Sequence, residues 1–261
     1  CAMTCDDVSQ HILGQIEAAT VEIDPFSHFV VRDVFPENYY VEMLRNWPNG
    51  AQFELQPNRR LVLRDWDPQV SDEQQQEFWK TTRQDYIKQF MMPAIYDKFM
   101  PHMREKFEPI FYGDWEEKVA LMEPRFSPGA LLCDIDGFIL RPHVDHPGQI
   151  AKIVFYAALD DENSEVGTDI YETYLQGFNC VNTFLFSEKD SEQLFIKRKT
   201  VPFLPNSMLV FLNTPRAFHG VSQLENSKFV RTLITSSVDL TAESALAIYG
   251  QDIIERTQGA R

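Results

Sequence analysis

Two histidines and one aspartate are the residues of this chain whose types and spacing can do chemistry. His143 and Asp145 stand two positions apart in the run 141–145, and His219 follows much later in the run 213–221. Two imidazoles and one carboxylate form the ligand set that holds a non-haem Fe(II) on one face and leaves the opposite face open for a co-substrate and dioxygen. If these side chains meet, they form the catalytic, metal-binding centre of an oxidative enzyme.

The first two ligands need a strand beneath them. Residues 138–145 have the pattern of a strand, in which side chains two apart point to the same face, so His143 and Asp145 can reach one ion while Val144 points away. A His-x-Asp triplet occurs by chance in roughly every second acid-rich chain with six histidines. The surrounding order supports the assignment, because an apolar strand at 151–159 follows the triplet and another at 207–213 leads into His219.

The remaining elements indicate helices first and strands afterwards. Helices are expected over 6–19, from Pro36 to the Pro-Asn-Gly stop at 48–50, and from Ser71 to Pro101 with a kink or break at Pro93; a short strand is expected at 29–34. Short β-branched and aromatic runs then predict strands at 119–126, 130–134, 138–145, 151–159, 168–174, 182–186, 193–198, 207–213, 217–224 and 229–238, with a final helix from Thr241. The fold class is therefore α+β, with a β-sandwich or barrel as its core.

Bulk composition narrows the class of partner. With 261 residues, 44% of them hydrophobic, the chain can form one large domain. A net charge of −15 and a pI near 4.8 argue against nucleic acid as a partner. No apolar run of 18 residues and no leader is seen, so we expect no membrane contact. Four cysteines without a CxxC pair fit a reducing compartment, so we expect a cytoplasmic protein. The expected partner is a small-molecule substrate. Nothing in the sequence indicates an oligomeric state.

A buried arginine is expected near the end of the β-rich half. Arg231 interrupts the apolar run 229–234, twelve positions after His219. An unpaired guanidinium inside a barrel is costly, so it needs a partner. A bound carboxylate suits its planar fork, and an ion pair with an acidic neighbour is the alternative.

With these residues in place, the chain resembles the 2-oxoglutarate/Fe(II)-dependent oxygenase superfamily over nearly its entire length. Residues 24–30 and 35–37 look like the entry of many bacterial members, and the strands after residue 118 look like their double-stranded β-helix, or jelly roll. The resemblance implies a single oxygenase domain with a helical N-terminal part at 1–117, a jelly-roll core at 118–240 and a C-terminal helix at 241–261.

The resemblance also implies the roles of site residues. His143, Asp145 and His219 would bind Fe(II), and Arg231 would hold the distal carboxylate of 2-oxoglutarate. Tyr156, Tyr171 and Thr168 are each candidates to assist Arg231. The implied reaction consumes 2-oxoglutarate and O2, releases succinate and CO2, and hydroxylates an unactivated C–H bond of a small metabolite such as an amino acid or a natural-product intermediate.

Alternatives stay open beside that function. The related halogenases have a small residue where this chain has Asp145, so hydroxylation is favoured over halogenation, while desaturation or ring formation is also possible. A hydroxylase of protein or peptide side chains is a second hypothesis, and a metal-binding jelly roll that senses a ligand is a non-enzymatic third. Compactness favours a small substrate.

Four arginines are candidates to contact the substrate: Arg60, Arg64, Arg125 and Arg141. Each can equally be a solvated surface residue. The acidic loop 160–166 is a second candidate for substrate selection, and the acidic composition is compatible with a cationic substrate. Asn213 either bonds near the metal or forms a turn.

Overall fold

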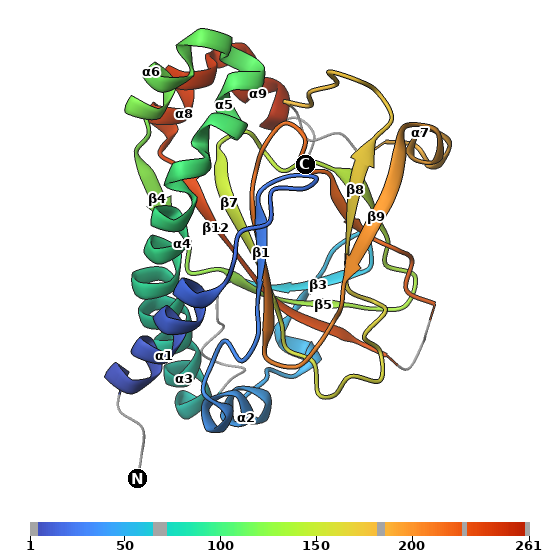
Figure 1. The fold of residues 1–261 in the computed structure, drawn as a ribbon. Helices are drawn as coiled ribbons and strands as arrows, with labels where there is room; N and C mark the ends of the chain where they lie inside the picture. The colour runs from blue at the N-terminus through green and yellow to red at the C-terminus, as the bar shows by residue number, and fades with distance from the viewer. Residues whose placement is uncertain (1–4, 65–71, 182–185, 226–228, 259–261) are drawn as a thin grey trace.

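Two antiparallel sheets form the core of the protein, as a computed structural model describes it for residues 5–64, 72–181, 186–225 and 229–258 (Figure 1). The larger sheet has the order β1-β10-β7-β12-β5-β3-β2, with β4 paired to β12, and the smaller has the order β6-β11-β8-β9. The strands are β1 (His28–Val31), β2 (Glu54–Leu55), β3 (Arg60–Leu63), β4 (Pro124–Phe126), β5 (Ala130–Asp134), β6 (Leu140–His143), β7 (Gln149–Tyr156), β8 (Thr168–Thr173), β9 (Phe195–Val201), β10 (Ser207–Leu212), β11 (His219–Val221) and β12 (Arg231–Leu240).

The chain passes back and forth between the two sheets. From β5 to β8 consecutive strands alternate between the larger and the smaller sheet, and after β9 the alternation resumes through β10, β11 and β12. This winding is that of a double-stranded β-helix, so the expected jelly-roll core is confirmed.

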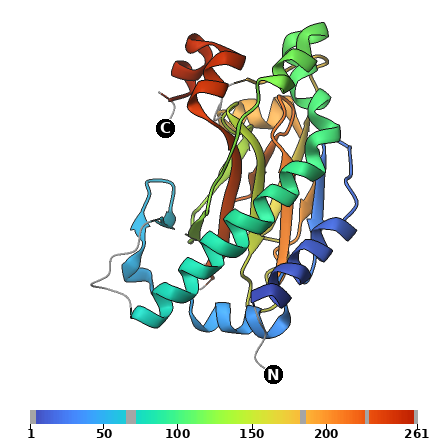
Figure 2. The ribbon, with the colours of Figure 1, turned by 90° about the vertical axis from the view of Figure 1, so that its left-hand side faces the viewer.

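Apolar side chains fill both faces of the larger sheet. Tyr156, Phe211 and Leu233 point inward and pack in one cluster with Ile170 of the smaller sheet. The opposite face is buried beneath the helices, and Figure 2 shows the long helical run from α3 to α4 crossing it. The helices are α1 (Cys5–Ala18), α2 (Glu37–Arg45), α3 (Glu73–Lys80), the π-helix η2 (Thr81–Met91), α4 (Met92–Phe99), α5 (Met103–Phe111), α6 (Trp115–Ala120), α7 (Glu188–Leu194), α8 (Ala242–Tyr249) and α9 (Gln251–Gln258), with short 3₁₀ turns η1 (Gly50–Gln52), η3 (Met100–His102) and η4 (Tyr112–Asp114). None of the described helices is both long and apolar enough to cross a membrane.

Several local expectations are corrected by the structure. Pro93 does not break the helical run, which continues without interruption from η2 into α4, where Pro93 lies in the first turn. The φ that its ring fixes is compatible with a helix. The strand expected at 119–126 is reduced to β4, since α6 continues to Ala120. The strand expected from residue 193 begins at Phe195, because α7 extends to Leu194. Ser187 caps the start of α7 by accepting a hydrogen bond from the Asp190 N–H. Most of the strand expected at 182–186 lies outside the described residues.

The two ends of the chain also differ from expectation. β1 is the short strand expected near 29–34, but β2 and β3 also come from the N-terminal part and join the larger sheet, so this part is not purely helical. At the C-terminal end Thr241 caps α8 through the Ser244 N–H, and α9 follows as a second helix after Gly250, whose φ of 77° lies in the left-handed region that favours glycine.

Candidate metal centre

The three predicted metal ligands lie together at one end of the smaller sheet. His143 is the last residue of β6, His219 is the first of β11, and the two are directly paired across the strands. Asp145 lies just beyond β6, and one ligand atom from each of the three residues can be chosen so that all lie within 4.8 Å of one another. Gly220 allows this approach, since a Cβ there would meet the Leu140 carbonyl oxygen at 2.3 Å.

Hydrogen bonds leave the metal-facing atoms of both imidazoles free. Nδ1 of His143 lies 2.9 Å from the Arg141 carbonyl oxygen, and Nδ1 of His219 lies 2.9 Å from that of Ala217. A carbonyl only accepts, so each Nδ1 carries the proton and each Nε2 keeps its lone pair. These Nε2 atoms lie 3.9 and 3.8 Å from the two carboxylate oxygens of Asp145.

The donor set fits a divalent transition metal. Oδ2 of Asp145 is buried without a hydrogen-bond partner among the described residues, and such an orphaned acceptor normally has a partner. Two imidazole nitrogens and one carboxylate converging on one point match the facial triad that holds non-haem Fe(II) and leaves positions open. The residues present therefore fit the metal that the sequence predicts.

Burial sets the charge of the three ligand side chains. Desolvation lowers the pKa of His143 and lowers that of His219 to about 4, with the neighbouring His143 adding to the second effect. Burial alone would raise the pKa of Asp145, but the positive charge of Lys152, and that of the adjacent imidazoles where they are protonated, lowers it below its ordinary value. At neutral pH the triad is thus two neutral imidazoles and one carboxylate, ready to bind a dication.

Asn213 holds the backbone around Asp145. Its Nδ2 lies 3.3 Å from the Asp145 carbonyl oxygen, 2.8 Å from that of His146 and 3.1 Å from that of Gln149. Of the two interpretations of this residue, the structure supports bonding near the metal. The side chain fixes the loop that carries the carboxylate ligand.

Lys106 of α5 also supports this loop, a role that was not predicted from the sequence. Its ammonium donates to the carbonyl oxygens of Pro147 at 3.1 Å, Gln149 at 2.8 Å and Asn213 at 2.8 Å. Burial lowers the pKa of Lys106 to about 7. A signal was present: Met103, Lys106 and Phe107 have the i, i+3, i+4 spacing of one helix face, which places this lysine on the buried side.

Arg231 is paired with an acidic residue, Asp134, that was not predicted from the sequence. Arg60 in β3, Asp134 in β5 and Arg231 in β12 form one row across three paired strands. Nη1 of Arg231 donates to Oδ2 of Asp134 at 2.8 Å, and Arg60 donates to both oxygens of the same carboxylate. The ion-pair alternative for Arg231 is therefore present in the structure.

This row still carries excess positive charge. Two guanidiniums share one carboxylate, and Nε of Arg231 is buried without a partner among the described residues. Nη2 of Arg231 donates to the Gly167 carbonyl oxygen and to Oγ1 of Thr168, both at 3.1 Å, and the Tyr156 hydroxyl donates to the same Oγ1 at 2.8 Å. The unmatched charge and the free donor fit a further carboxylate.

The other predicted residues are more scattered. Tyr171 lies apart from Arg231 and donates from its hydroxyl to Asp169 at 3.2 Å. The Arg125 side chain is 72% exposed beside Asp239, and that of Arg141 is 37% exposed, 4.0 Å from Glu188. Arg64, like Arg60, lines a cavity on the inner face of the larger sheet.

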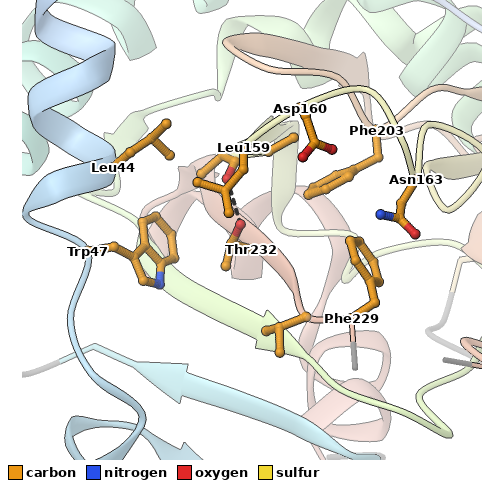
Figure 3. Close-up of a pocket in the computed structure, with 11 residues that line it drawn as sticks. Leu44, Trp47, Leu159, Asp160, Asn163, Phe203, Phe229 and Thr232 are labelled. Atoms are coloured by element: carbon orange, nitrogen blue, oxygen red, sulfur yellow. Dashed lines mark hydrogen bonds between the residues drawn. The ribbon is translucent and has the colours of Figure 1, made fainter. Parts of the chain in front are cut away.

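The acidic loop 160–166 borders a different cavity. Figure 3 shows this space, of about 430 Å³, between Trp47, Asp160, Phe203 and Phe229. This cavity opens beyond the carboxyl end of β7. The triad lies nearer the first half of β7, where the charge of Lys152 acts on Asp145. None of its lining residues is a triad member, so this cavity is not the metal centre.

Comparisons with known proteins find likeness in structure alone. No protein-family model matches the sequence, and no curated protein matches it. HygX from Streptomyces hygroscopicus with nickel, 2-oxoglutarate and hygromycin B bound has a TM-score of 0.46 and 13% identity, covering 84% of this chain and 85% of that chain. A Pseudomonas putida prolyl-4-hydroxylase has a TM-score of 0.46 and 11% identity, covering 88% and 99%. A structure of prolyl 4-hydroxylases from Phytophthora capsici has a TM-score of 0.47 and 13% identity, covering 98% and 76%.

Proposed function

We propose that this protein is an Fe(II)- and 2-oxoglutarate-dependent dioxygenase that hydroxylates an unactivated C–H bond of a small molecule, with release of succinate and CO2. The observation that carries the proposal is the triad itself, in which two free Nε2 atoms and an orphaned carboxylate oxygen converge. When bound, the iron with 2-oxoglutarate and O2 supplies the oxidising chemistry.

The chain's own residues hold and orient the reactants. His143, Asp145 and His219 bind the metal, and the Nδ1 hydrogen bonds keep both imidazoles in the tautomer that ligation needs. Arg231 binds the distal carboxylate of 2-oxoglutarate through its unpaired Nε, beside Thr168 and Tyr156.

The carboxylate of Asp145 and the dimensions of the site support the choice of reaction and substrate. A carboxylate occupies the ligand position that a halide would need, which supports hydroxylation over halogenation. The cavity on the inner face of the larger sheet has a volume of about 450 Å³, within the usual range for small-molecule sites. No triad residue lines this cavity, but its wall includes Lys152, whose charge acts on Asp145. A cavity of this size next to the triad supports a small metabolite over a protein side chain.

A spectroscopic experiment tests the metal and co-substrate together. Anaerobic protein with Fe(II) should develop a weak visible charge-transfer band when 2-oxoglutarate is added, because the keto acid chelates an open ferrous site. The band should be absent from the His143→Ala/Asp145→Ala double variant and present in His11→Ala, which changes a distant histidine. No band in metal-loaded wild type, or an equal band in the double variant, would refute the proposal.

A further inference from the structure

The cavity on the inner face of the larger sheet is basic, although the protein is strongly acidic. Its wall contains four cationic side chains, Arg60, Arg64, Arg83 and Lys152, and no acidic residue among the described residues that line it. The chain as a whole carries a net charge of −15. A local reversal of sign in a concave site raises the local concentration of anions.

Lys152 differs from Arg60 and Arg83 of this wall, because both of these arginines have partners. Arg83 donates to the carbonyl oxygens of Gly129 and Arg64, and Arg60 pairs with Asp134, so both guanidiniums support the structure. Lys152 is half-buried and makes no hydrogen bond or ion pair within the part of the chain that the structure describes. Withdrawing an ammonium from water without a partner costs free energy. The carboxylates of Asp145 and Asp239 interact with Lys152 only at a distance, since neither forms an ion pair with it. The ammonium can therefore bind an anion from solution.

The register of the strands places Lys152 beside the metal centre. Lys152 pairs directly with Phe211 of β10, whose ring centroid lies 4.4 Å from that of His219. Lys152 also adds to the lowering of the pKa of Asp145, although burial of that carboxyl acts in the opposite direction. A group bound by this ammonium would lie close to the metal.

Lys152 is also well separated from the proposed co-substrate anchor. Its partner in β12 is Ser237, six positions after Arg231 in the same strand. Six residues at about 3.3 Å each span roughly 20 Å. A keto acid that chelates the metal and reaches Arg231 therefore leaves Lys152 for a different anion.

We propose that Lys152, with Arg64 and the hydroxyl of Thr235 on the same cavity wall, binds an oxyanion of the primary substrate. The substrate is then a small molecule that carries a carboxylate or a phosphate group. This inference rests on the proposed function and deepens it, and it replaces the cationic substrate that composition alone allows.

Anion binding to the loaded but unreactive protein tests the site directly. In protein saturated with Ni(II) and 2-oxoglutarate, calorimetric titration with inorganic phosphate and with acetate should show saturable binding of at least one anion. Lys152→Met should weaken that binding at least tenfold, while Lys152→Arg and the exposed-lysine control Lys88→Met should keep it. Tighter binding of phosphate indicates a phosphate ester, and tighter binding of acetate indicates a carboxylic acid.

Two results would overturn the inference: no saturable anion binding to wild type, or equal affinity in Lys152→Met. Lys152→Met should still be saturated by Ni(II) and 2-oxoglutarate, although loss of the charge that acts on Asp145 changes the concentration of Ni(II) that saturation needs. Saturation of the variant separates this inference from the proposed function. If wild type binds the anion but not 2-oxoglutarate, the proposed function fails on its own. Thermal melting of each variant checks that the fold is intact.

A turnover screen then identifies the substrate class. Matched pairs of metabolites that differ as carboxylic acid and carboxamide, or as phosphate ester and free alcohol, are scored by succinate release. Only the anionic member of an active pair should stimulate turnover, and Lys152→Met should lower kcat/KM for it by at least tenfold. Stimulation by the neutral members alone would contradict the inference.

Discussion

Nη1 of Arg231 donates to Oδ2 of Asp134 at 2.8 Å, and both side chains are buried. Because Arg60 shares the same carboxylate, the pair fixes the orientation of the Arg231 fork without neutralising the row. A guanidinium held in this way is preorganised for an incoming carboxylate, and little conformational entropy is lost when that carboxylate binds.

Replacing Asp134 with Asn should therefore destabilise the protein. The change leaves two guanidiniums without a counter-charge, and breaking a buried ion pair costs about 3 kcal/mol. Urea unfolding should show this loss, and added 2-oxoglutarate should recover part of it by supplying a carboxylate to Arg231. Asp136→Asn removes a charge two positions away and should change stability little. Equal stability of both variants would show that the row does not depend on its carboxylate.

Replacing Tyr156 with Phe should weaken co-substrate binding. The Tyr156 hydroxyl donates to Oγ1 of Thr168, which in turn accepts from Arg231. Loss of this hydrogen bond, at about 1 kcal/mol, should raise KM for 2-oxoglutarate about fivefold to tenfold while kcat changes less. Tyr171→Phe is the matched control, because that hydroxyl bonds to Asp169. The same rise in KM in both variants would contradict the assignment.

The sequence predicted the features that depend on local periodicity. His143 and Asp145 share a face because a strand repeats every two residues, and the breaks between apolar runs located most of the core strands. The pairing of Asp134 with Arg231 could not be predicted in this way. It depends on the register between two strands almost a hundred positions apart, and no local sequence pattern encodes that register.

The net charge of the chain did not predict the positive charge of the cavity wall, because strand pairing also determines which charged residues meet there. Net charge sums over the whole surface, whereas the inner face of the larger sheet brings Arg60, at the start of β3, and Arg64, just after its end, together with Lys152 of β7. Strand pairing, and not composition, determines the sign of the charge beside the metal.

Asn213 gives a prediction about metal affinity. Its side chain bonds to three carbonyl oxygens of the loop that carries Asp145. Asn213→Ala should weaken binding of Fe(II) or Ni(II) about tenfold, since groups that orient ligands commonly contribute that much. Calorimetric titration under anaerobic conditions measures the change, with Asn163→Ala as the control in a loop away from the centre. Unchanged metal affinity in Asn213→Ala would mean that the loop holds its shape without this side chain.

Lys106 gives a prediction about pH, because burial lowers its pKa to about 7 while an unfolded lysine titrates near 10.4. Between these values the unfolded chain binds more protons at this residue than the folded protein does. The free energy of unfolding should therefore rise with pH across this range, by at most about 1.4 kcal/mol per pH unit, and the contribution should be constant below pH 7. Lys106→Met lacks the group, so its stability should rise less steeply from pH 7 to pH 10.

Urea unfolding of wild type and Lys106→Met at unit steps from pH 6 to pH 10 makes the comparison, with Lys88→Met as the exposed control that should follow wild type. Parallel curves for wild type and Lys106→Met above pH 7 would show that the three carbonyl acceptors keep the ammonium charged despite its burial. Divergence beginning near pH 7 would instead show that the loop beside the metal is held by a lysine that loses its proton close to neutral pH. In that case metal affinity, measured over the same pH range, should change with the protonation of Lys106 in wild type and not in Lys106→Met.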